Sequence, residues 1–266
     1  MKIHWPTVAT AALLAAPLRL LSQSSAQPAL PPVATVLERL VERSEHQSNN
    51  DGAFNQQYGY TGTKVIEYRN SKGAVKKREE KSSRIIPSTH PAAAKPPAVA
   101  PQAESIRAGP GSRSVTETNS TGRGRAFERK DFSLNDDLLG RFQFAVSGRE
   151  WLNGRPALVL DFKPADKKLP ERSLKDKFIN KTAGRLWVDE ADYVLARADL
   201  RLIDPVNVVG GLVGAVRNFK YHFDRERTSD GLWFTRAVDW HLEAREVVVH
   251  REVDYHEEKA DVRKAW

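Results

Sequence analysis

Hydrophobic and polar positions alternate through the stretch from Arg141 to Leu202, and this pattern predicts two β-hairpins built on one plan. The first turns at Asn153-Gly154, a dipeptide that tolerates the positive φ angles of a tight hairpin turn. The second turns in the polar run 189–192. One face of each hairpin is therefore expected to be apolar, formed by Phe142, Phe144, Val146, Leu158, Leu160 and Phe162 in the first, and by Leu186, Val188, Val194, Ala196, Ala198, Leu200 and Leu202 in the second.

Further strands are expected on both sides of these hairpins. The same alternation predicts them at 60–68, 74–85, 215–225, 232–240, 242–250 and, as a last strand at the sheet edge, 252–259. The turn between the first two lies at Ser71-Lys72-Gly73. With the two central hairpins, the pattern predicts one antiparallel sheet of about eight to ten strands.

Helical periodicity is sparse by comparison. Val33 to Arg43 has apolar residues three and four positions apart, as in an amphipathic helix. Residues 170–179 are expected to form a short helix with Leu174 and Phe178 on one side, and 44–55 a polar link to the first strand. The predicted fold class is mainly β with a few helices (α+β), in which a wide curled sheet has little helical cover.

Two segments differ in composition from the rest. Residues 87–125 are rich in Pro, Ala, Ser, Gly and Thr and are expected to be a disordered insertion, because they cannot bury enough apolar surface to offset the loss of conformational entropy. Strand patterns resume after this insertion, so 27–266 is expected to be a single domain rather than two. Residues 1–26 precede it as a separate targeting segment.

The N-terminal segment predicts export. Lys2 precedes an apolar run, Val8 to Leu21, and Ser24-Ser25-Ala26 supplies the small residues that a signal peptidase reads, with cleavage after Ala26. The alternative is a membrane anchor, which Pro17 and Arg19 disfavour, as does a run shorter than the roughly 20 apolar residues that span a bilayer.

Composition narrows the compartment. The chain contains no cysteine, so neither a disulfide framework nor lipidation is expected, and a bacterial periplasm fits an exported chain of this kind. The net charge is +8, and loss of Lys2 and Arg19 with the signal peptide leaves +6. Charges of both signs are intermixed along the strands, which is typical of a solvated sheet face. The alternative is attraction to anionic lipid or other envelope polymers; a nucleic acid partner is not expected.

The sequence contains no motif that is typical of a catalytic site. The loop Gly210-Gly-Leu-Val-Gly214 lacks the Lys-Ser/Thr of a phosphate loop and is expected to be a flexible apolar loop, or a lip at a cavity mouth. The histidines show no metal-ligand spacing, although His222 and His250 could share a face. The acidic pairs Asp136-Asp137 and Glu257-Glu258 are expected to be solvated at turns or chain ends. We therefore expect no enzyme activity, no cofactor and no metal.

Aromatic residues, in contrast, are frequent on the predicted strands. They are compatible with an ordinary core, but so few helices would leave much of the sheet uncovered, so the sheet either closes into a barrel or curls around an apolar cavity. The expected ligand-binding residues are Phe142, Phe144, Val146, Leu158, Leu160, Phe162, Leu186, Val188, Leu212, Val213, Phe219 and Trp233.

The order of segments resembles a known group. A signal peptide, a helix, a charged hairpin and then Gly184-Arg-Leu-Trp-Val-Asp-Glu-Ala-Asp-Tyr-Val-Leu195 are similar to the LolA-like superfamily of outer-membrane lipoprotein-sorting proteins. Val208 to Phe219 and Asp230-Gly-Leu-Trp-Phe234 add to this resemblance. It implies a half-barrel sheet wrapped on helices, with an apolar cavity for acyl chains. The 87–125 insertion and the scarcity of lid helices depart from the pattern.

The function expected from these features is that of a periplasmic, non-enzymatic carrier that binds lipid or lipoprotein acyl chains. Members of the resembling superfamily carry lipoproteins or lipids, or sense envelope stress. The alternative is therefore an interaction module that contacts a membrane regulator, and an inner- or outer-membrane protein is its expected partner.

Overall fold

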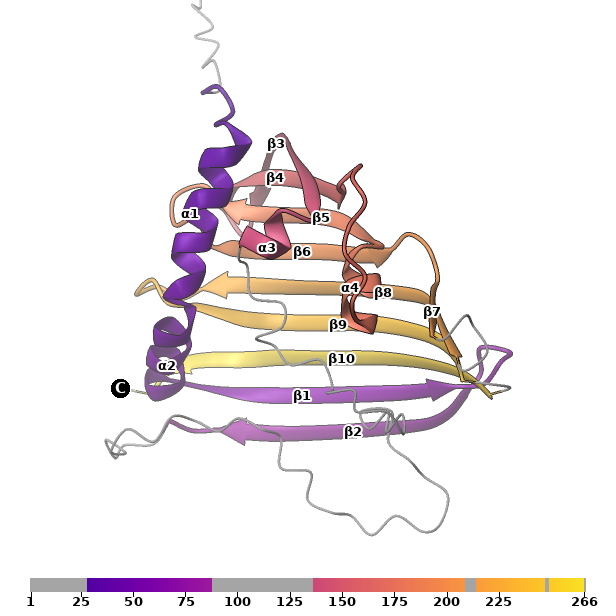
Figure 1. Ribbon diagram of the computed structural model, residues 1–266. Helices are drawn as coiled ribbons and strands as arrows, with labels where there is room; N and C mark the ends of the chain where they lie inside the picture. Colours follow the sequence, from indigo (N-terminus) through magenta and orange to yellow (C-terminus); the bar gives the residue numbers. More distant parts are fainter. Residues whose placement is uncertain (1–27, 88–135, 209–213, 247–248, 266) are drawn as a thin grey trace, which may run out of the picture. The chain divides into compact units, whose positions relative to one another are not determined.

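Ten strands form one open antiparallel sheet in the computed structural model, in the order β2-β1-β10-β9-β8-β6-β5-β4-β3, with β7 paired to β8 (Figure 1). The structure describes residues 28–87, 136–208, 214–246 and 249–265. The helices are α1 (Val33–Glu45), α2 (Gln47–Gln57), α3 (Asp136–Leu139) and α4 (Leu174–Ile179). The strands are β1 (Tyr58–Arg69), β2 (Val75–Ile85), β3 (Phe142–Leu152), β4 (Arg155–Pro164), β5 (Thr182–Asp189), β6 (Leu195–Leu202), β7 (Val206–Val208), β8 (Gly214–Arg227), β9 (Trp233–Glu246) and β10 (Val249–Lys264).

This architecture confirms the predicted fold class. The sheet has two free edges, β2 and β3, so it is not a closed barrel. All these elements belong to one compact unit, Pro31–Trp266, which is distinct from Met1–Leu30. No helix in the described part of the chain is long and apolar enough to cross a membrane. Pro87, the first residue of the predicted insertion, is buried in the fold, and the remainder of that insertion lies outside the described residues.

Both central hairpins form, each with its turn at the predicted residues. Asn153 and Gly154 have φ angles of 52° and 75°, which is why this dipeptide suits the β3–β4 turn. In the β5–β6 turn, the Asp189 carboxylate accepts hydrogen bonds from the backbone N–H groups of Ala191 and Asp192, which holds the turn closed. Phe144 lies opposite Phe162, and Leu160 lies opposite Leu186, so the predicted apolar residues share one face.

One prediction about the second hairpin is wrong. A β-bulge shifts the register between Trp187 and Val188, where Val188 pairs with Leu195 and Trp187 pairs with Arg197. The bulge adds one residue to β6 and reverses the side on which the preceding residues point. Val194 and Ala196 therefore pack with Trp187, on the face opposite to Ala198.

Two C-terminal strands also differ from the prediction. The break expected near His241 is absent, because Val238, Trp240 and Leu242 continue one alternation opposite Phe223, Tyr221 and Phe219 of β8. The final strand is not an edge strand. β10 lies between β9 and β1 and joins the N-terminal hairpin to the rest of the sheet.

The segment 44–55, expected to be a polar link, is mostly helical. Helix α2 is held in place by contacts with residues that are distant in sequence, and its own local pattern does not predict them. The Phe54 ring stacks on Phe234 at a centroid distance of 4.8 Å, and the Asn50 side chain bonds both the backbone N–H and the carbonyl of Trp233. Packing thus overrides a weak local propensity.

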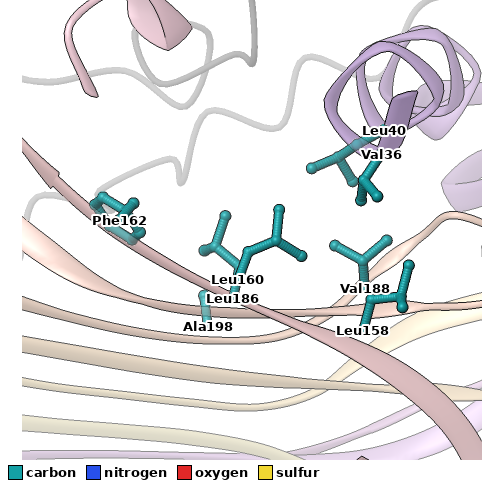
Figure 2. Packing of buried hydrophobic residues seen from close by; sticks show 8 residues of the cluster. All are labelled: Val36, Leu40, Leu158, Leu160, Phe162, Leu186, Val188 and Ala198. Carbon is teal, nitrogen blue, oxygen red and sulfur yellow. The ribbon is translucent and has the colours of Figure 1, made fainter. Parts of the chain in front are cut away.

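The main core lies between α1 and the middle of the sheet. Val36 and Leu40 of α1 point toward Leu158 and Val188, and Leu160, Leu186, Ala198 and Phe162 continue the cluster along the same face (Figure 2). Helix α4, which begins at the Ser173 capping box, packs on this face through the Phe178 ring, 5.0 Å from that of Phe219. We call this side of the sheet the helix-bearing face.

Candidate functional site

Nine of the twelve residues predicted to bind a ligand lie on the helix-bearing face, and eight of them belong to the main core or pack against it. Leu158, Leu160, Phe162, Leu186 and Val188 are buried in the main core, and Phe142, Phe144 and Val146 pack against it half-exposed. Because Leu158, Leu160 and Val188 have no exposed surface, they act as filled core beneath and beside α1 rather than as the wall of an open pocket.

The ninth of these residues, Phe219, lies on the helix-bearing face against α4. Trp233 belongs to a second cluster with Trp187 and Val159, whose side chains alternate with those of the main core and so lie on the opposite face. Leu212 and Val213 are outside the described residues.

Strand register extends the predicted apolar surface into a row that crosses almost the whole sheet. Each member lies opposite the next on the neighbouring strand. We call this set the apolar row; it consists of Phe144, Phe162, Gly184, Leu200, Tyr221, Trp240, Tyr255 and Ile66. Every member except buried Phe162 is partly exposed, so the row is the part of the helix-bearing face best placed to contact a ligand.

Each member of the row that lies on β8, β9 or β10 makes an aromatic contact. The Trp240 and Tyr255 rings stack at 5.1 Å with an interplanar angle of 7°, and the Tyr221 ring lies 6.0 Å from Phe223 and 6.5 Å from Phe219. Paired rings in these geometries contribute beyond simple burial and restrict side-chain motion. The result is a preformed aromatic surface on β8, β9 and β10.

The ligand-binding residues predicted from the sequence do not include four members of the apolar row, namely Tyr221, Trp240, Tyr255 and Ile66. The alternation Phe219-Tyr221-Phe223 and the continuation through Trp240 to Leu242 were available signals for the first two. Tyr255 and Ile66 could be recognised only once β10 was known to lie between β9 and β1, which is a long-range pairing that no local pattern encodes.

The row ends in charge at the β1–β2 edge. The Lys64 ammonium lies 5.0 Å from the centre of the Tyr255 ring, within reach of a cation–π interaction. Burial raises the pKa of the Tyr255 hydroxyl, and its hydrogen bond to Glu257 raises it further, so Tyr255 remains a neutral donor at physiological pH. Glu257 is thus within a strand, where the sequence predicted a turn or chain end.

The opposite face carries many charged side chains beside the cluster that contains Trp187 and Trp233. A groove of about 1190 Å³ includes three histidines whose Nδ1 atoms each contact an aspartate on a neighbouring strand: His222 with Asp199, His241 with Asp254, and His256 with Asp239. His250 is aligned with Arg245 on β9. Within the described ranges, no three His, Asp or Glu side chains are grouped so as to hold a metal ion.

Electrostatics at His222 show how this face is balanced. Burial lowers the pKa of His222, but hydrogen bonds with Asp199 and Asp224 outweigh burial and raise it above the ordinary value. Burial likewise raises the pKa of Asp224, whereas Arg197 and His222 outweigh that effect and lower it. The three histidines of this groove each pair with an aspartate, which is typical of a solvated face.

Comparison with known proteins finds similarity to solved structures only. No family model matches the chain, and no curated protein matches it. An outer membrane lipoprotein-sorting protein domain from Vibrio parahaemolyticus, with that function described as putative, is 11% identical at a TM-score of 0.31, over 86% of this chain and 93% of that one.

Two further solved structures show a comparably low similarity. A LolA superfamily protein from Nitrosomonas europaea is 11% identical at a TM-score of 0.32, over 88% of this chain and 94% of that one. The Pseudomonas aeruginosa MucA/MucB complex structure matches at 10% identity and a TM-score of 0.22, over 85% and 99%. The open antiparallel sheet described above rests on the chain's own strand order and not on these matches.

Proposed function

We propose that this protein binds the acyl chain of a lipid or lipoprotein on the apolar row, without catalysing a reaction. The observation that carries the proposal is a continuous row of half-exposed side chains, one from each of five neighbouring strands: Leu200, Tyr221, Trp240, Tyr255 and Ile66. Contiguous apolar surface of this kind is uncommon on soluble proteins unless it meets a partner.

The shape of this surface suits an extended hydrocarbon chain. Neighbouring strands lie about 4.8 Å apart, so five strands span roughly 19 Å across the sheet. The stacked Trp240 and Tyr255 rings form a flat floor, and Phe219 and Phe223 border Tyr221 on either side along β8. Each methylene laid on this floor and removed from water contributes up to about 0.8 kcal/mol.

The proposed setting is the bacterial periplasm, reached after cleavage behind Ala26. The apolar run and small residues of the N-terminal segment support it. N-terminal sequencing of the protein recovered from its host should find a chain that starts at Gln27. Recovery of the intact N-terminus in a membrane fraction would contradict this assignment.

A fluorescent fatty acid titrated against the purified protein tests the binding function. Trp240→Ala should weaken probe binding at least several-fold, because it removes the centre of the aromatic floor. Its cost in stability should be below the ~3–5 kcal/mol of a fully buried Trp, since the ring is half-exposed. Trp151→Ala is the matched control: the same ring is removed from a site that is 75% exposed on β3, and binding should not change.

Native mass spectrometry of the protein from its host separates the two candidate functions. A co-purified lipid would support the carrier. A wild-type protein that is empty, binds no acyl probe and is recovered with a membrane protein would instead support the interaction module and refute the proposal.

A further inference from the structure

Two lysines stand directly opposite each other at the end of the helix-bearing face. Lys64 of β1 is the register partner of Lys81 of β2, and both side chains are exposed. Directly opposed like charges in an antiparallel pair destabilise it. Such a pair persists at little cost where an anion sits between the two ammonium groups.

The carboxylates near this pair already have other partners. Glu257, opposite Lys64 on β10, accepts the hydrogen bond of the Tyr255 hydroxyl. Glu79, two residues from Lys81, pairs with Lys77 at 2.6 Å. In the described part of the chain, neither Lys64 nor Lys81 forms an ion pair with a carboxylate within 4.0 Å.

This pair adjoins the apolar row rather than standing apart from it. Lys64 lies two residues from Ile66, the last apolar member, and its ammonium lies over the Tyr255 ring. A second row of register partners changes from apolar to charged in the same way. It runs from Ala198, Phe223 and Val238 to Glu257, Lys64 and Lys81. Apolar surface and excess positive charge therefore meet at one place.

We infer that the ligand is an anionic amphiphile, with its acyl chain on the apolar row and its phosphate or carboxylate headgroup against the Lys64–Lys81 pair. The inference rests on the proposed function and adds a ligand class and an orientation to it. The headgroup lies at the β1–β2 edge, and the chain runs toward β8. The positive charge of the pair complements the headgroup, and the rings exclude water from the chain.

Dodecyl probes that share one tail test the headgroup assignment. Dodecyl phosphate, dodecylphosphocholine and dodecyl maltoside are titrated below their micelle concentrations, with inorganic phosphate as the tail-free probe. The wild type should prefer dodecyl phosphate over dodecyl maltoside by about threefold to tenfold, as expected for two exposed charge contacts. The preference should shrink as salt is raised, because exposed charges are screened.

The double variant Lys64→Gln/Lys81→Gln should lose most of this preference while binding dodecyl maltoside as the wild type does. Lys163→Gln/Lys220→Gln is the matched control, since it removes the same charge from residues that line the groove of the opposite face. That control should keep the preference. Unchanged binding of the maltoside also shows that each variant is folded.

Each other outcome overturns a specific claim. Equal binding of all three dodecyl probes would refute the anionic headgroup and leave the proposed function intact. Inorganic phosphate binding as tightly as dodecyl phosphate would show a simple anion site. Probe binding that appears only when residues 88–135 are replaced by a short Gly/Ser linker would show that this segment occupies the row. Failure of every dodecyl probe would refute the proposed function itself.

Discussion

The rows of register partners on the helix-bearing face are buried in one half of the sheet, β3 to β6, and half-exposed in the other half, from β8 to β1. In β4, β5 and β6, Leu160, Leu186 and Ala198 are at most 6% exposed. Their row continues through Phe223 and Val238, both half-exposed, and then through Glu257 to the exposed lysines of β1 and β2. Identical alternation therefore produces a core where α1 packs and a surface where it does not, and amphipathic patterning alone does not distinguish the two.

The largest difference between the halves should come from a buried ion pair. Asp189 of β5 is 2% exposed and accepts hydrogen bonds of 2.6 and 2.8 Å from Arg155. Asp189→Ala removes the buried acceptor of these two bonds and of the Ala191 and Asp192 backbone N–H groups, and should lower the free energy of unfolding by about 3–5 kcal/mol. In the other half, Asp239 pairs with His256 but both are more than 40% exposed, so Asp239→Ala should cost no more than about 1 kcal/mol. Urea denaturation measures both, and equal losses would contradict the comparison.

Matched leucines test the cover provided by α1. Leu160→Ala should destabilise the protein by about 2–5 kcal/mol, because the residue is fully buried and leaves a cavity. Leu242→Ala removes the same atoms from a half-exposed position on β9 and should cost clearly less. If both variants shift the urea midpoint equally, the β8–β1 half is as well covered as the β3–β6 half, and a surface for ligands is not present there.

A pair of strand glycines should show a smaller difference. A Cβ at Gly184 would lie 2.0 Å from the Asp199 carbonyl oxygen, so β5 and β6 must separate to accommodate Gly184→Ala. Overpacking of this kind costs about 1–3 kcal/mol. A Cβ at Gly62 of β1 would meet its nearest atom, in the Tyr60 ring, at an ordinary 3.6 Å. Gly62→Ala should therefore be close to neutral in thermal unfolding, and a loss as large as that of Gly184→Ala would argue against the close strand approach.

The smallest effect is expected at the seam between the halves, where β6 meets β8. His222 contacts Asp199 across this seam and Asp224 on its own strand, and Arg197 also bonds Asp224. The pKa of His222 is raised in the folded protein, so protonated His222 stabilises the fold. This contribution to the free energy of unfolding is complete below the ordinary pKa of 6.5 and is lost as the pH rises through the raised pKa. Stability should thus fall slightly above pH 6.5, and His222→Gln should remove this slope. The lowered pKa of Asp224 acts only in acid and leaves this window unaffected. A steeper slope in the variant would reverse the sign of the argument.

The local pattern predicted the two central hairpins because each hairpin is determined by residues that are close together in the chain. The Asn153-Gly154 turn and the alternating residues beside it determine register without reference to distant strands. The bulge in β6 could not be predicted in this way, since Val194 and Ala196 satisfy the same alternation whether or not a residue is added. Helix α2 was missed for a related reason, because its partners Phe234 and Trp233 are far away in sequence.

The candidate site divides along the same line. The β3–β5 residues could be assigned to one face from sequence, but whether they form filled core or open surface depends on where α1 docks. The Lys64–Lys81 pair is recognisable only from the β1–β2 register, and its nearness to aromatic rings only from the β1–β10 pairing. Long-range strand pairing therefore carries the information that the sequence pattern lacks.

The position of β10 has a consequence for how the chain reaches its folded state. β10 follows every other described strand in the chain, yet β1 bonds to the rest of the sheet only through it. A lone two-stranded hairpin is marginally stable in water, and closing so long a loop slows folding. The early hairpin must therefore wait, with an open edge, until the C-terminal segment emerges. Pulse-labelled hydrogen exchange should therefore show β1 amides gaining protection together with those of β10.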